Sequence, residues 1–378
     1  MRILTTFFSA FVVLSFLFSC KSGNARFSEV AGDTVPMSYA VNLAMVDFDG
    51  YTRVDVRNPW DTTRTLHTYL LVPAAADMPA ALPEGTVIRT PLKSSVIYSS
   101  VHNSLVVELG ADSAISGICD VQYIHQPQLV ERIKSGDIAD CGNSMTPNIE
   151  RIIELRPDAI LLSPFENSGG YGKLAQLGVP IVECADYMET SPLGRAEWMK
   201  FYGRLFGAES LADSLFDSTE TAYLAIKHLA DSAATRPEVL MDRMFGAVWN
   251  VPGAYSTMGR FIEDAGGANP FCEYKVSGST PLAPEQVLYK AGDARVWLIR
   301  YAQNDDMTMS QLAADNAIYG KFAPFINNNV YGCNTSVSYF YEDIPFHPHW
   351  LLGEFVAIIH PELAADSLSP RYFKKLNP

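Results

Sequence analysis

The sequence lacks the motifs by which common catalytic sites are recognised. It contains no G-x-S-x-G, no H-E-x-x-H, no G-x-G-x-x-G and no phosphate-binding loop. No catalytic residue is therefore predicted. The lack of any such motif over 378 residues favours a protein that binds a solute, not an enzyme. We expect no cofactor, and we expect no metal site built from protein side chains.

Basic residues are scarce. The chain has 28 Lys and Arg against 42 Asp and Glu, a formal net charge of −14. This balance argues against nucleic acid as a partner, because phosphate binding needs clustered Lys and Arg. After the first 19 residues, no stretch approaches the ~20 consecutive apolar residues that a membrane span requires. With 48% hydrophobic and 19% charged residues, the composition is that of a globular protein.

The six cysteines form no C-x-x-C pair, so neither a zinc ribbon nor a thioredoxin-like site is expected. In an exported protein Cys119 and Cys141 could form a disulfide. The alternative is that these cysteines are free and buried as small apolar residues.

The first 19 residues predict a signal peptide, with Arg2 followed by an apolar run. The segment Leu17-Phe18-Ser19-Cys20 resembles a bacterial lipoprotein box, in which Cys20 would carry the lipid and become the mature N-terminus. We therefore expect a periplasmic protein whose only contact with the membrane is this lipid. The alternatives are an uncleaved anchor, or a plain signal peptide in which Cys20 occurs by chance.

The run 208–236 contains neither Gly nor Pro and lies between Gly207 and Pro237. Apolar residues recur in it at the three- and four-residue spacing of a helix face, and they form two adjacent stripes. This pattern predicts a helix about 40 Å long at about 1.5 Å per residue. We interpret it as a strut between two lobes; the alternative is a long helix inside one domain. The stripes are Leu211, Leu215, Ala222, Ile226, Leu229 and Ala233, and Ala212, Phe216, Thr219 and Tyr223.

A short pattern occurs once on each side of this helix. A small residue, Pro and an acidic or amide residue precede a helix and then an apolar strand, at 146–162 and again at 283–299. In the first copy Thr146 is expected to cap the helix, with Pro147 in its first turn. The repetition predicts two similar lobes of βαβ units.

The predicted fold class is α/β, with two βαβ lobes bridged by one long rigid helix and a small N-terminal β appendage. Alternating residues before residue 73 predict antiparallel strands, and 73–85 is rich in Ala and Pro and predicts a loop. The expected organisation is a signal peptide over 1–19, a lipid-anchored leash and β appendage over 20–85, an N-terminal lobe over 86–206, the interlobe helix over 207–236 and a C-terminal lobe over 237–378.

Aromatic and polar residues gather in the predicted loops that follow strands. In open α/β sheets these loops line the ligand crevice. Large flat side chains with a few polar tips suit a planar or aromatic ligand. Trp249, Tyr255, Tyr123 and Phe165 are expected to stack on it, and Arg300 to pair with a carboxylate or phosphate. The candidate ligand-binding residues are Ser99, His102, Tyr123, Met145, Phe165, Tyr171, Trp249, Tyr255, Arg300 and Tyr341.

His347 and His349 flank Pro348, and on an extended segment they could hold a metal. We favour the alternative that they belong to a loop leading into the last helix.

At this point the chain resembles the class III periplasmic substrate-binding proteins of ABC importers for ferric siderophores, haem and cobalamin. The similarity extends from about residue 93 to about residue 363. It is carried by five stretches: Gly142-Asn-Ser-Met-Thr-Pro-Asn-Ile-Glu150-Arg-Ile, Arg156-Pro-Asp-Ala-Ile-Leu-Leu162, Leu177-Gly-Val-Pro-Ile181, Tyr255-Ser-Thr-Met-Gly with Phe261-Ile-Glu263-Asp-Ala-Gly-Gly267, and Leu282-Ala-Pro-Glu-Gln-Val287.

The resemblance implies two lobes joined by one stiff helix, with the ligand between them and little closure on binding. It also implies that Glu150 and Glu263 dock on arginines of a dimeric ABC permease. The expected ligand is a small-molecule metal chelate, either a ferric siderophore or haem, or alternatively a corrinoid. Residues 26–85 have no counterpart in the family's usual members.

Three other functions stay open on the sequence. The first is a lipoprotein of this fold that stores or scavenges its ligand without a permease. The second is an enzyme acting on a corrinoid, and the third is a structural or adhesive surface protein built around the appendage.

Overall fold

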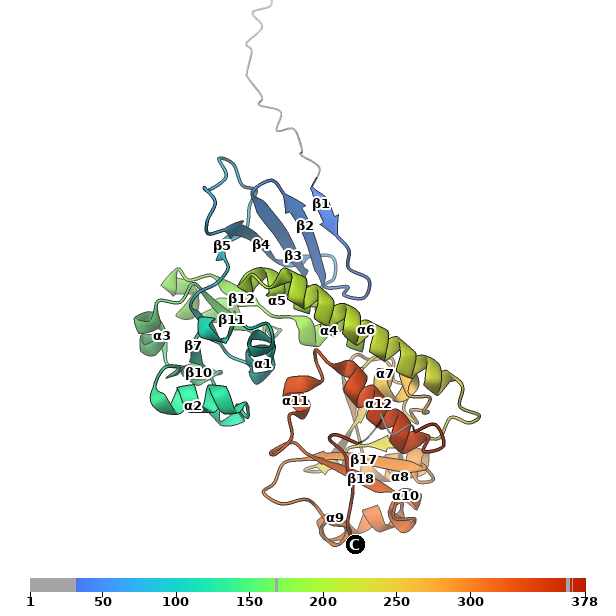
Figure 1. The fold of residues 1–378 in the computed structure, drawn as a ribbon. Coiled ribbons are helices and arrows are strands. Elements are labelled where there is room, and N and C mark those ends of the chain that lie inside the picture. Colours follow the sequence, from blue (N-terminus) through green and yellow to red (C-terminus); the bar gives the residue numbers. More distant parts are fainter. Residues whose placement is uncertain (1–31, 167–168, 365–367, 369) are drawn as a thin grey trace, which may run out of the picture. The chain divides into compact units, whose positions relative to one another are not determined.

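The N-terminal lobe is built on a fully parallel five-stranded sheet (Figure 1). The computed structural model describes residues 32–378 except 167–168, 365–367 and 369, so the predicted signal peptide and Cys20 lie outside the described residues. The strand order is β12-β11-β6-β7-β8. The strands are β6 (Ser95–Ile97), β7 (Ile115–Ile118), β8 (Ala139–Asp140), β11 (Ala159–Leu162) and β12 (Ile181–Glu183).

Short helices and a hairpin connect these strands. The four residues of β11 are all buried, as a continuous apolar run in a parallel sheet predicts. The connecting elements are α1 (Ser100–Glu108), α2 (Pro127–Ser135), α3 (Ile149–Leu155), strands β9 (Gly142–Asn143) and β10 (Thr146–Pro147), and the 3₁₀ helices η1 (Asp112–Ala114), η2 (Val121–Tyr123), η3 (Gly169–Tyr171), η4 (Leu174–Leu177) and η5 (Asp186–Met188).

Helix α3 starts two residues later than expected. The side chain of Asn148, not Thr146, accepts the hydrogen bond of an N-cap, here from the backbone N–H of Arg151 at 3.0 Å. Thr146 and Pro147 instead pair with Asn143 and Gly142 in the small hairpin. Asn is as good a cap as Thr, and the hairpin removes Thr146 from the helix.

The C-terminal lobe has a second sheet with three parallel strands and one short antiparallel strand, in the order β13-β17-β18-β19. A separate three-stranded antiparallel sheet, β14-β15-β16, is formed by the part of the chain between β13 and β17. The strands are β13 (Val239–Met241), β14 (Met244–Phe245), β15 (Val248–Pro252), β16 (Ser279–Leu282), β17 (Val296–Tyr301), β18 (Val330–Asn334) and β19 (Lys374–Lys375).

Helices in this lobe follow the strands, as they do in the first lobe. The last helix begins at Pro348, which occupies its first turn. The helices are α7 (Thr257–Asp264), α8 (Pro284–Ala291), α9 (Met309–Asp315), the 3₁₀ helix η6 (Ala317–Lys321), α10 (Ala323–Ile326), α11 (Phe340–Asp343) and α12 (Pro348–Ile359).

One long helix, α6 (Glu209–Asp231), joins the two lobes. It follows α4 (Pro192–Glu197) and α5 (Met199–Phe206), and Gly207 makes the left-handed turn that separates α5 from α6. Of the two predicted stripes, the second is the buried one: Ala212, Phe216, Thr219 and Tyr223 are all buried. Leu211, in the other stripe, is 43% exposed. The first half of α6 belongs to the N-terminal core and the second half to the C-terminal core.

The N-terminal appendage is a five-stranded sheet, β1-β2-β3-β4-β5. Its first four strands are antiparallel, as predicted, but the fifth lies past residue 85 and runs parallel to β4. The loop after β4 spans about a dozen residues, enough for the return that a parallel neighbour requires. The strands are β1 (Asp33–Val35), β2 (Leu43–Phe48), β3 (Tyr51–Arg57), β4 (Thr65–Pro73) and β5 (Thr86–Thr90).

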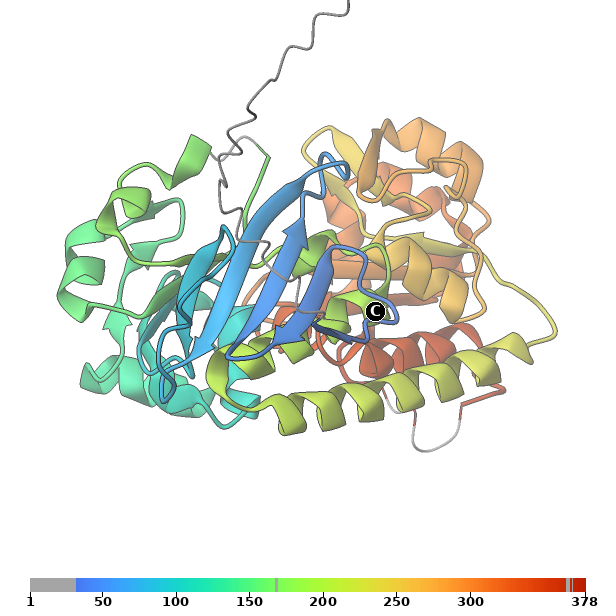
Figure 2. The same cartoon turned by 90° about the horizontal axis from the view of Figure 1, so that it is seen from above.

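The appendage shares its hydrophobic core with the N-terminal lobe. Val54, Val56 and Tyr69 of the appendage belong to the same buried cluster as Trp198 and Phe201 of the α4–α5 region. Figure 2 shows the appendage sheet over α5 and the beginning of α6. The appendage is therefore not a separately packed unit.

Five cysteines fall within the described residues, and all five are free thiols. Cys119 and Cys141 are both buried and form no disulfide with each other. They agree with the alternative that these cysteines are packed as small apolar residues. Within the described residues, no helix has both the length and the apolar character needed to cross a membrane.

Candidate ligand-binding cleft

A cavity of about 1150 Å³ opens at the carboxyl ends of the N-terminal parallel strands. Strands β6 and β11 are neighbours, but the chain leaves β6 toward β7 on the other side, so the strand order reverses between them. Such a reversal leaves a crevice at the carboxyl ends of the two strands. Tyr98 and Ser99 after β6, and Leu162 and Ser163 at the end of β11, line the cavity there.

The C-terminal lobe supplies the opposite wall. Ala302 follows β17, and Thr335, Ser336 and Ser338 follow β18. Tyr341 and Glu342 of α11 complete this side. The cavity therefore lies between the lobes and is lined by loops and helix ends from both.

Six of the ten predicted ligand-binding residues line this cavity. Met145 and Tyr123 are 72% and 61% exposed, so their apolar surfaces are available to a ligand. The arrangement brings together aromatic rings from three separate segments of the chain. The six are Ser99, Tyr123, Met145, Phe165, Tyr171 and Tyr341.

Trp249 does not line the cavity, which corrects the prediction that it stacks on a ligand. It lies within β15 and is fully buried, with its ring stacked on Trp297 at a centroid distance of 5.6 Å. Its Nε1–H donates to the carbonyl oxygen of Met241 at 2.9 Å. Trp249 is a core residue of the C-terminal lobe, because the expected loop is a strand.

Arg300 also lies outside the cavity lining, and its charge is already matched. Its Nη2 lies 2.5 Å from Asp242 Oδ2, and its Nε donates to Oδ1 at 2.9 Å. Burial opposes ionisation of Arg300, but the Asp242 carboxylate outweighs it and raises the pKa of the guanidinium. The expected pairing of Arg300 with a ligand anion is therefore corrected to an internal ion pair.

Tyr255 and His102 are the other two predicted ligand-binding residues that do not line the cavity. Tyr255 is 41% exposed, but its ring faces the guanidinium of Arg260 at 5.1 Å, outside the cavity lining. His102 is on α1 and is 1% exposed. It is buried directly behind the cavity wall that Ser99, Ser100 and Val101 form.

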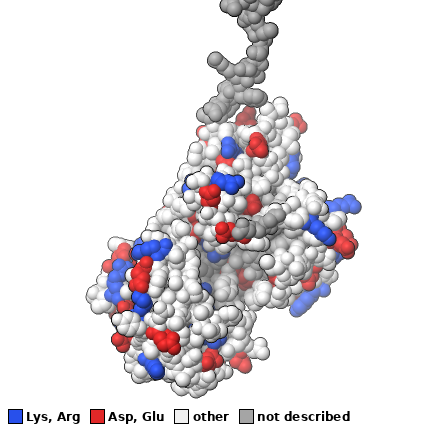
Figure 3. All heavy atoms as spheres, turned by 180° about the vertical axis from the view of Figure 1, so that it is seen from behind, with Lys and Arg blue, Asp and Glu red and all other residues white. Residues whose placement is uncertain are grey.

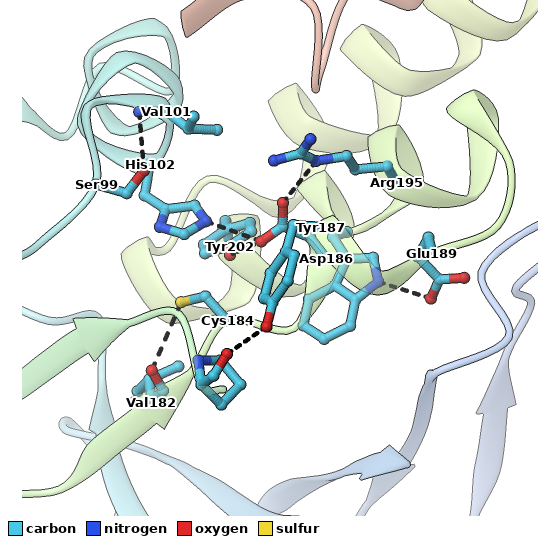
Figure 4. A network of polar contacts seen from close by, with 12 residues as sticks. Ser99, Val101, His102, Val182, Cys184, Asp186, Tyr187, Glu189, Arg195 and Tyr202 are labelled. Atoms are coloured by element: carbon cyan, nitrogen blue, oxygen red, sulfur yellow. Dashed lines mark hydrogen bonds and ion pairs between the residues drawn. The ribbon is translucent and has the colours of Figure 1, made fainter. Parts of the chain in front are cut away.

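A buried polar network holds that wall in place (Figure 4). Asp186 accepts from Arg195 Nε at 2.9 Å and from the Tyr202 hydroxyl at 3.2 Å, and its Oδ1 lies 2.8 Å from His102 Nε2. Burial opposes ionisation of Asp186, but His102 and Arg195 outweigh it and lower its pKa to about 2. The wall of the cavity is thus tied to the α4–α5 segment that leads into α6.

Four acidic or basic residues of the cavity lining were missed by the sequence reasoning. Asp120 adopts a left-handed backbone with φ of 54° and accepts hydrogen bonds from Asn143 Nδ2 at 2.9 Å and Ser144 N at 3.2 Å. Asp120 lies two residues after β7, in the same connection as Tyr123. A search of the loops that follow strands, which selected Tyr123, could therefore also have selected Asp120. The others are His125, Lys173 and Glu342.

The two lobes touch through residues of the cavity lining. The backbone N–H of His125 donates to Glu342 Oε1 at 3.3 Å, and the Tyr339 hydroxyl donates to the carbonyl oxygen of His125 at 3.2 Å. Burial raises the pKa of the Glu342 carboxyl, although His125 opposes the shift. These contacts join α11 of one lobe to the loop before α2 of the other.

His347 and His349 lie at the start of α12, so they are not on the extended segment from which they could hold a metal. His347 Nε2 lies 2.7 Å from Glu108 Oε2 on α1, a further contact between the lobes. Burial lowers the pKa of His349 to about 4. The residues that the structure describes contain no group of three or more His, Cys, Asp or Glu able to hold a metal ion.

Glu150 and Glu263 are both exposed, in the first turn of α3 and near the end of α7. Glu263 Oε2 accepts from Arg260 Nη1 at 3.1 Å. An exposed pair of this kind contributes little to stability.

The molecular surface carries interspersed charges. On the face drawn in Figure 3, acidic and basic side chains alternate and no broad basic patch is present.

The chain belongs to the periplasmic binding protein family, whose sequence model matches residues 98–336. It is thus a substrate-binding protein of the kind that serves ABC transporters, as the resemblance in the sequence predicted.

Among related proteins is an uncharacterised lipoprotein of Methanocaldococcus jannaschii, 25% identical over 312 residues that cover 77% of this chain and 70% of the relative. Two solved structures share the fold. The periplasmic haem-binding protein of Vibrio cholerae has a TM-score of 0.58 at 14% identity, covering 71% of this chain and 100% of that one. The periplasmic vitamin B12-binding protein of Vibrio cholerae has a TM-score of 0.54 at 15% identity, covering 71% and 97%.

Proposed function

We propose that this protein is the substrate-binding lipoprotein of an ABC importer for an iron complex, either a ferric siderophore or haem. The cavity between the lobes is the observation that carries this proposal. Its volume of about 1150 Å³ exceeds the ~300–1,000 Å³ typical of small-molecule sites, so a bare metal ion or small oxyanion would leave it largely empty. A bulky chelate fits it and brings its own metal.

Aromatic side chains supply the contact area for such a ligand. Tyr123, Phe165 and Tyr341 are 61%, 49% and 54% exposed and line the cavity from both lobes. A ring of this size contributes a large apolar surface and a defined stacking direction. Serine hydroxyls at 99, 100, 336 and 338 provide polar contacts that orient the ligand.

A corrinoid is the second candidate, and the charge of the cavity favours it. Among the described residues that line the cavity, Asp120 and Glu342 carry carboxyl groups and Lys173 is the one Lys or Arg. A site with this balance repels a ligand that carries several negative charges, such as a ferric tricatecholate. An uncharged or cationic complex suits it better.

Titration of the purified protein with coloured chelates tests the ligand class. The probes are haemin, a ferric tricatecholate, a ferric trihydroxamate and cyanocobalamin, followed by absorption and by quenching of tryptophan fluorescence. We expect at least one to bind at a ratio of one to one, and the tricatecholate to bind weakest. If none of the four binds, and the protein from its native host is colourless, the proposal fails.

The permease is tested by Glu150→Ala combined with Glu263→Ala. Because both carboxylates are exposed and outside the cavity, we expect cellular uptake to fall while ligand affinity is unchanged. Glu154→Ala is the matched control, since Glu154 is exposed on the same helix α3 and pairs with Arg151. Unchanged uptake in the double variant would favour storage or scavenging without a permease.

The lipid anchor and the absence of catalysis are part of the proposal. Cys20→Ser should release the protein from the membrane fraction. A bound chelate recovered chemically intact after long incubation would agree with a transport role, whereas a converted corrinoid would indicate an enzyme.

A further inference from the structure

Tyr171 of the cavity wall is anchored from behind by a buried carboxylate. Its hydroxyl donates to Glu183 Oε1 at 2.5 Å. Glu183 is the last residue of β12, at the edge of the N-terminal parallel sheet, and is 7% exposed. A hydrogen bond to an ionised group is among the stronger ones, so the direction of the Tyr171 ring depends on Glu183.

Glu183 is in turn held by the N-terminal appendage. Its Oε2 lies 3.1 Å from Nδ1 of His67 on β4, and Nε2 of His67 lies 2.7 Å from the Thr86 hydroxyl on β5. The backbone N–H of Glu183 donates to the Tyr69 hydroxyl at 2.8 Å. Tyr69 also stacks on His67 at a centroid distance of 4.3 Å. The appendage therefore fixes both the backbone and the side chain of Glu183.

Tyr171 needs this support because its backbone is in a sparsely populated region. Its φ is 60°, in the left-handed range that bulky residues rarely adopt. Such a conformation is strained and persists only where surrounding contacts fix it. The glycines on either side, Gly170 and Gly172, also have positive φ and give the segment its sharp turn.

We propose that the appendage sets the shape of the ligand cavity through the chain His67–Glu183–Tyr171. His67 and Glu183 are positioning residues: neither lines the cavity, yet together they place the Tyr171 ring in its wall. The inference rests on the proposed function of the cleft in one respect, that the ligand touches Tyr171. It gives residues 32–90 a role in ligand recognition.

The first experiment needs no ligand. The protein is labelled with 3-fluorotyrosine, and the ¹⁹F signals of Tyr171 and Tyr123 are assigned from Tyr171→Phe and Tyr123→Phe. We expect His67→Phe, which keeps the ring that stacks on Tyr69, and Glu183→Ala to shift the Tyr171 signal. The Tyr123 signal is the internal control and should not move. Glu183→Gln, which can still accept from the Tyr171 hydroxyl, should restore most of the original position.

The second experiment measures affinity for whichever of haemin, the ferric trihydroxamate and cyanocobalamin binds the unmodified protein. Glu183→Ala and His67→Phe should weaken binding about 5- to 10-fold, the effect of about one lost hydrogen bond. His67→Phe should change nothing further in a Tyr171→Phe background, because His67 acts through Tyr171. A merely structural role would weaken both backgrounds alike.

The outcomes separate the two proposals. If no probe binds but the fluorine signals behave as expected, the proposed ligand class is wrong and the positioning chain stands. An unmoved Tyr171 signal in both His67→Phe and Glu183→Ala would overturn the inference even if a probe binds. Should Glu183→Ala fail to fold, His67→Phe alone carries the test.

Discussion

Three buried glutamates accept hydrogen bonds from backbone N–H groups that have no partner within a sheet or helix. Glu197 accepts from residues 38, 39 and 40, each at 2.8 Å. Glu189 accepts from residues 41 and 42, and Glu354 accepts from residues 371, 372 and 373. In each case one carboxylate fastens an irregular segment, near the start or the end of the described chain, onto a helix or turn of a lobe. Buried backbone donors need such partners, because an unpaired donor costs about as much as a lost hydrogen bond.

Of these three carboxylates, Glu354 is the most suitable for an experimental test. Burial raises its pKa to about 7 from an ordinary 4.5, although the backbone N–H groups oppose the shift. Between these pH values the unfolded chain releases a proton from Glu354 that the native state keeps. The contribution of Glu354 to the free energy of unfolding is therefore fully present below pH 4.5 and is lost as the pH rises to 7. At about 1.4 kcal/mol per pKa unit, the loss is about 3 kcal/mol.

Glu354→Gln should remove this loss, because its amide stays uncharged and its oxygen can accept the same bonds. Urea unfolding of both proteins at pH 5 and pH 8 measures it. The unmodified protein should lose more stability between the two pH values than the variant does. Equal losses would show that Glu354 does not titrate in this range.

At the scale of elements, α6 is a component of two hydrophobic cores. Ala212 and Phe216 pack with the N-terminal core, and Tyr223 and Ala230 with the C-terminal core. The Tyr39 hydroxyl, just before β2, also donates to Glu220 on α6 at 2.5 Å. The helix is held on successive turns by different parts of the protein, which makes it a stiff connection and not a free linker.

Phe216→Ala should destabilise the protein by about 3–5 kcal/mol, the range for truncating a buried aromatic. Phe216 is 2% exposed, lies 6.1 Å from the Tyr39 ring and has Lys200 Nζ 4.7 Å from its centroid. Thermal or urea unfolding followed by circular dichroism provides the measurement. Leu224→Ala is the control on the same helix, since Leu224 is 44% exposed and its loss should cost far less. Similar effects of the two substitutions would mean that the helix is not packed as described.

At the scale of the whole molecule, the lobes contact each other directly as well as through α6. His125 meets Glu342, Glu108 meets His347, and the Tyr202 ring lies 5.8 Å from Phe346. Phe346 of the C-terminal lobe belongs to the N-terminal buried cluster. A large hinge motion would have to expose this ring and break the two histidine–glutamate contacts.

Ligand binding should therefore change the molecular dimensions very little. Small-angle X-ray scattering, with and without a saturating chelate, should give overlapping radii of gyration. The control is Phe346→Ala, which removes the buried contact between the lobes and should allow a larger difference. A clear contraction of the unmodified protein on binding would contradict the stiff connection.

Removal of the appendage tests whether the N-terminal lobe depends on the hydrophobic core that the two share. Deletion of residues 32–90 would uncover Trp198 and Phe201, which are fully buried against the appendage strands. We expect aggregation or loss of soluble expression, because exposed apolar patches of this kind associate. Size-exclusion chromatography gives the readout. A monomeric, folded deletion product would show that the N-terminal lobe closes its core alone.

Most of the fold follows from local sequence patterns. The period of 3.6 residues, without Gly or Pro, predicted α6, and the apolar run of β11 predicted a buried parallel strand. The signals fail at boundaries: Asn148 replaced Thr146 as a cap because a hairpin competed for Thr146. They also fail for β5, whose partner is set by a return of the chain and not by alternation.

The candidate site was predicted only in part. Tyr123 and Phe165 line the cavity because they follow strands, and Tyr341 because it lies on α11, so topology places all three there. Trp249 and Arg300 carry equally suggestive side chains, but one completes a core and the other faces Asp242. Residue type does not distinguish a ligand contact from an internal partner.

The sequence by itself determined the class of fold, the position of the connecting helix and the family, because these depend on periodic patterns within short stretches. Tertiary structure alone decided which aromatic rings face the cavity, which charges are already paired and how the appendage reaches Tyr171 through Glu183. The physical reason is that a side chain's free energy depends on the partners it meets in space, and those partners come from segments far apart in the chain.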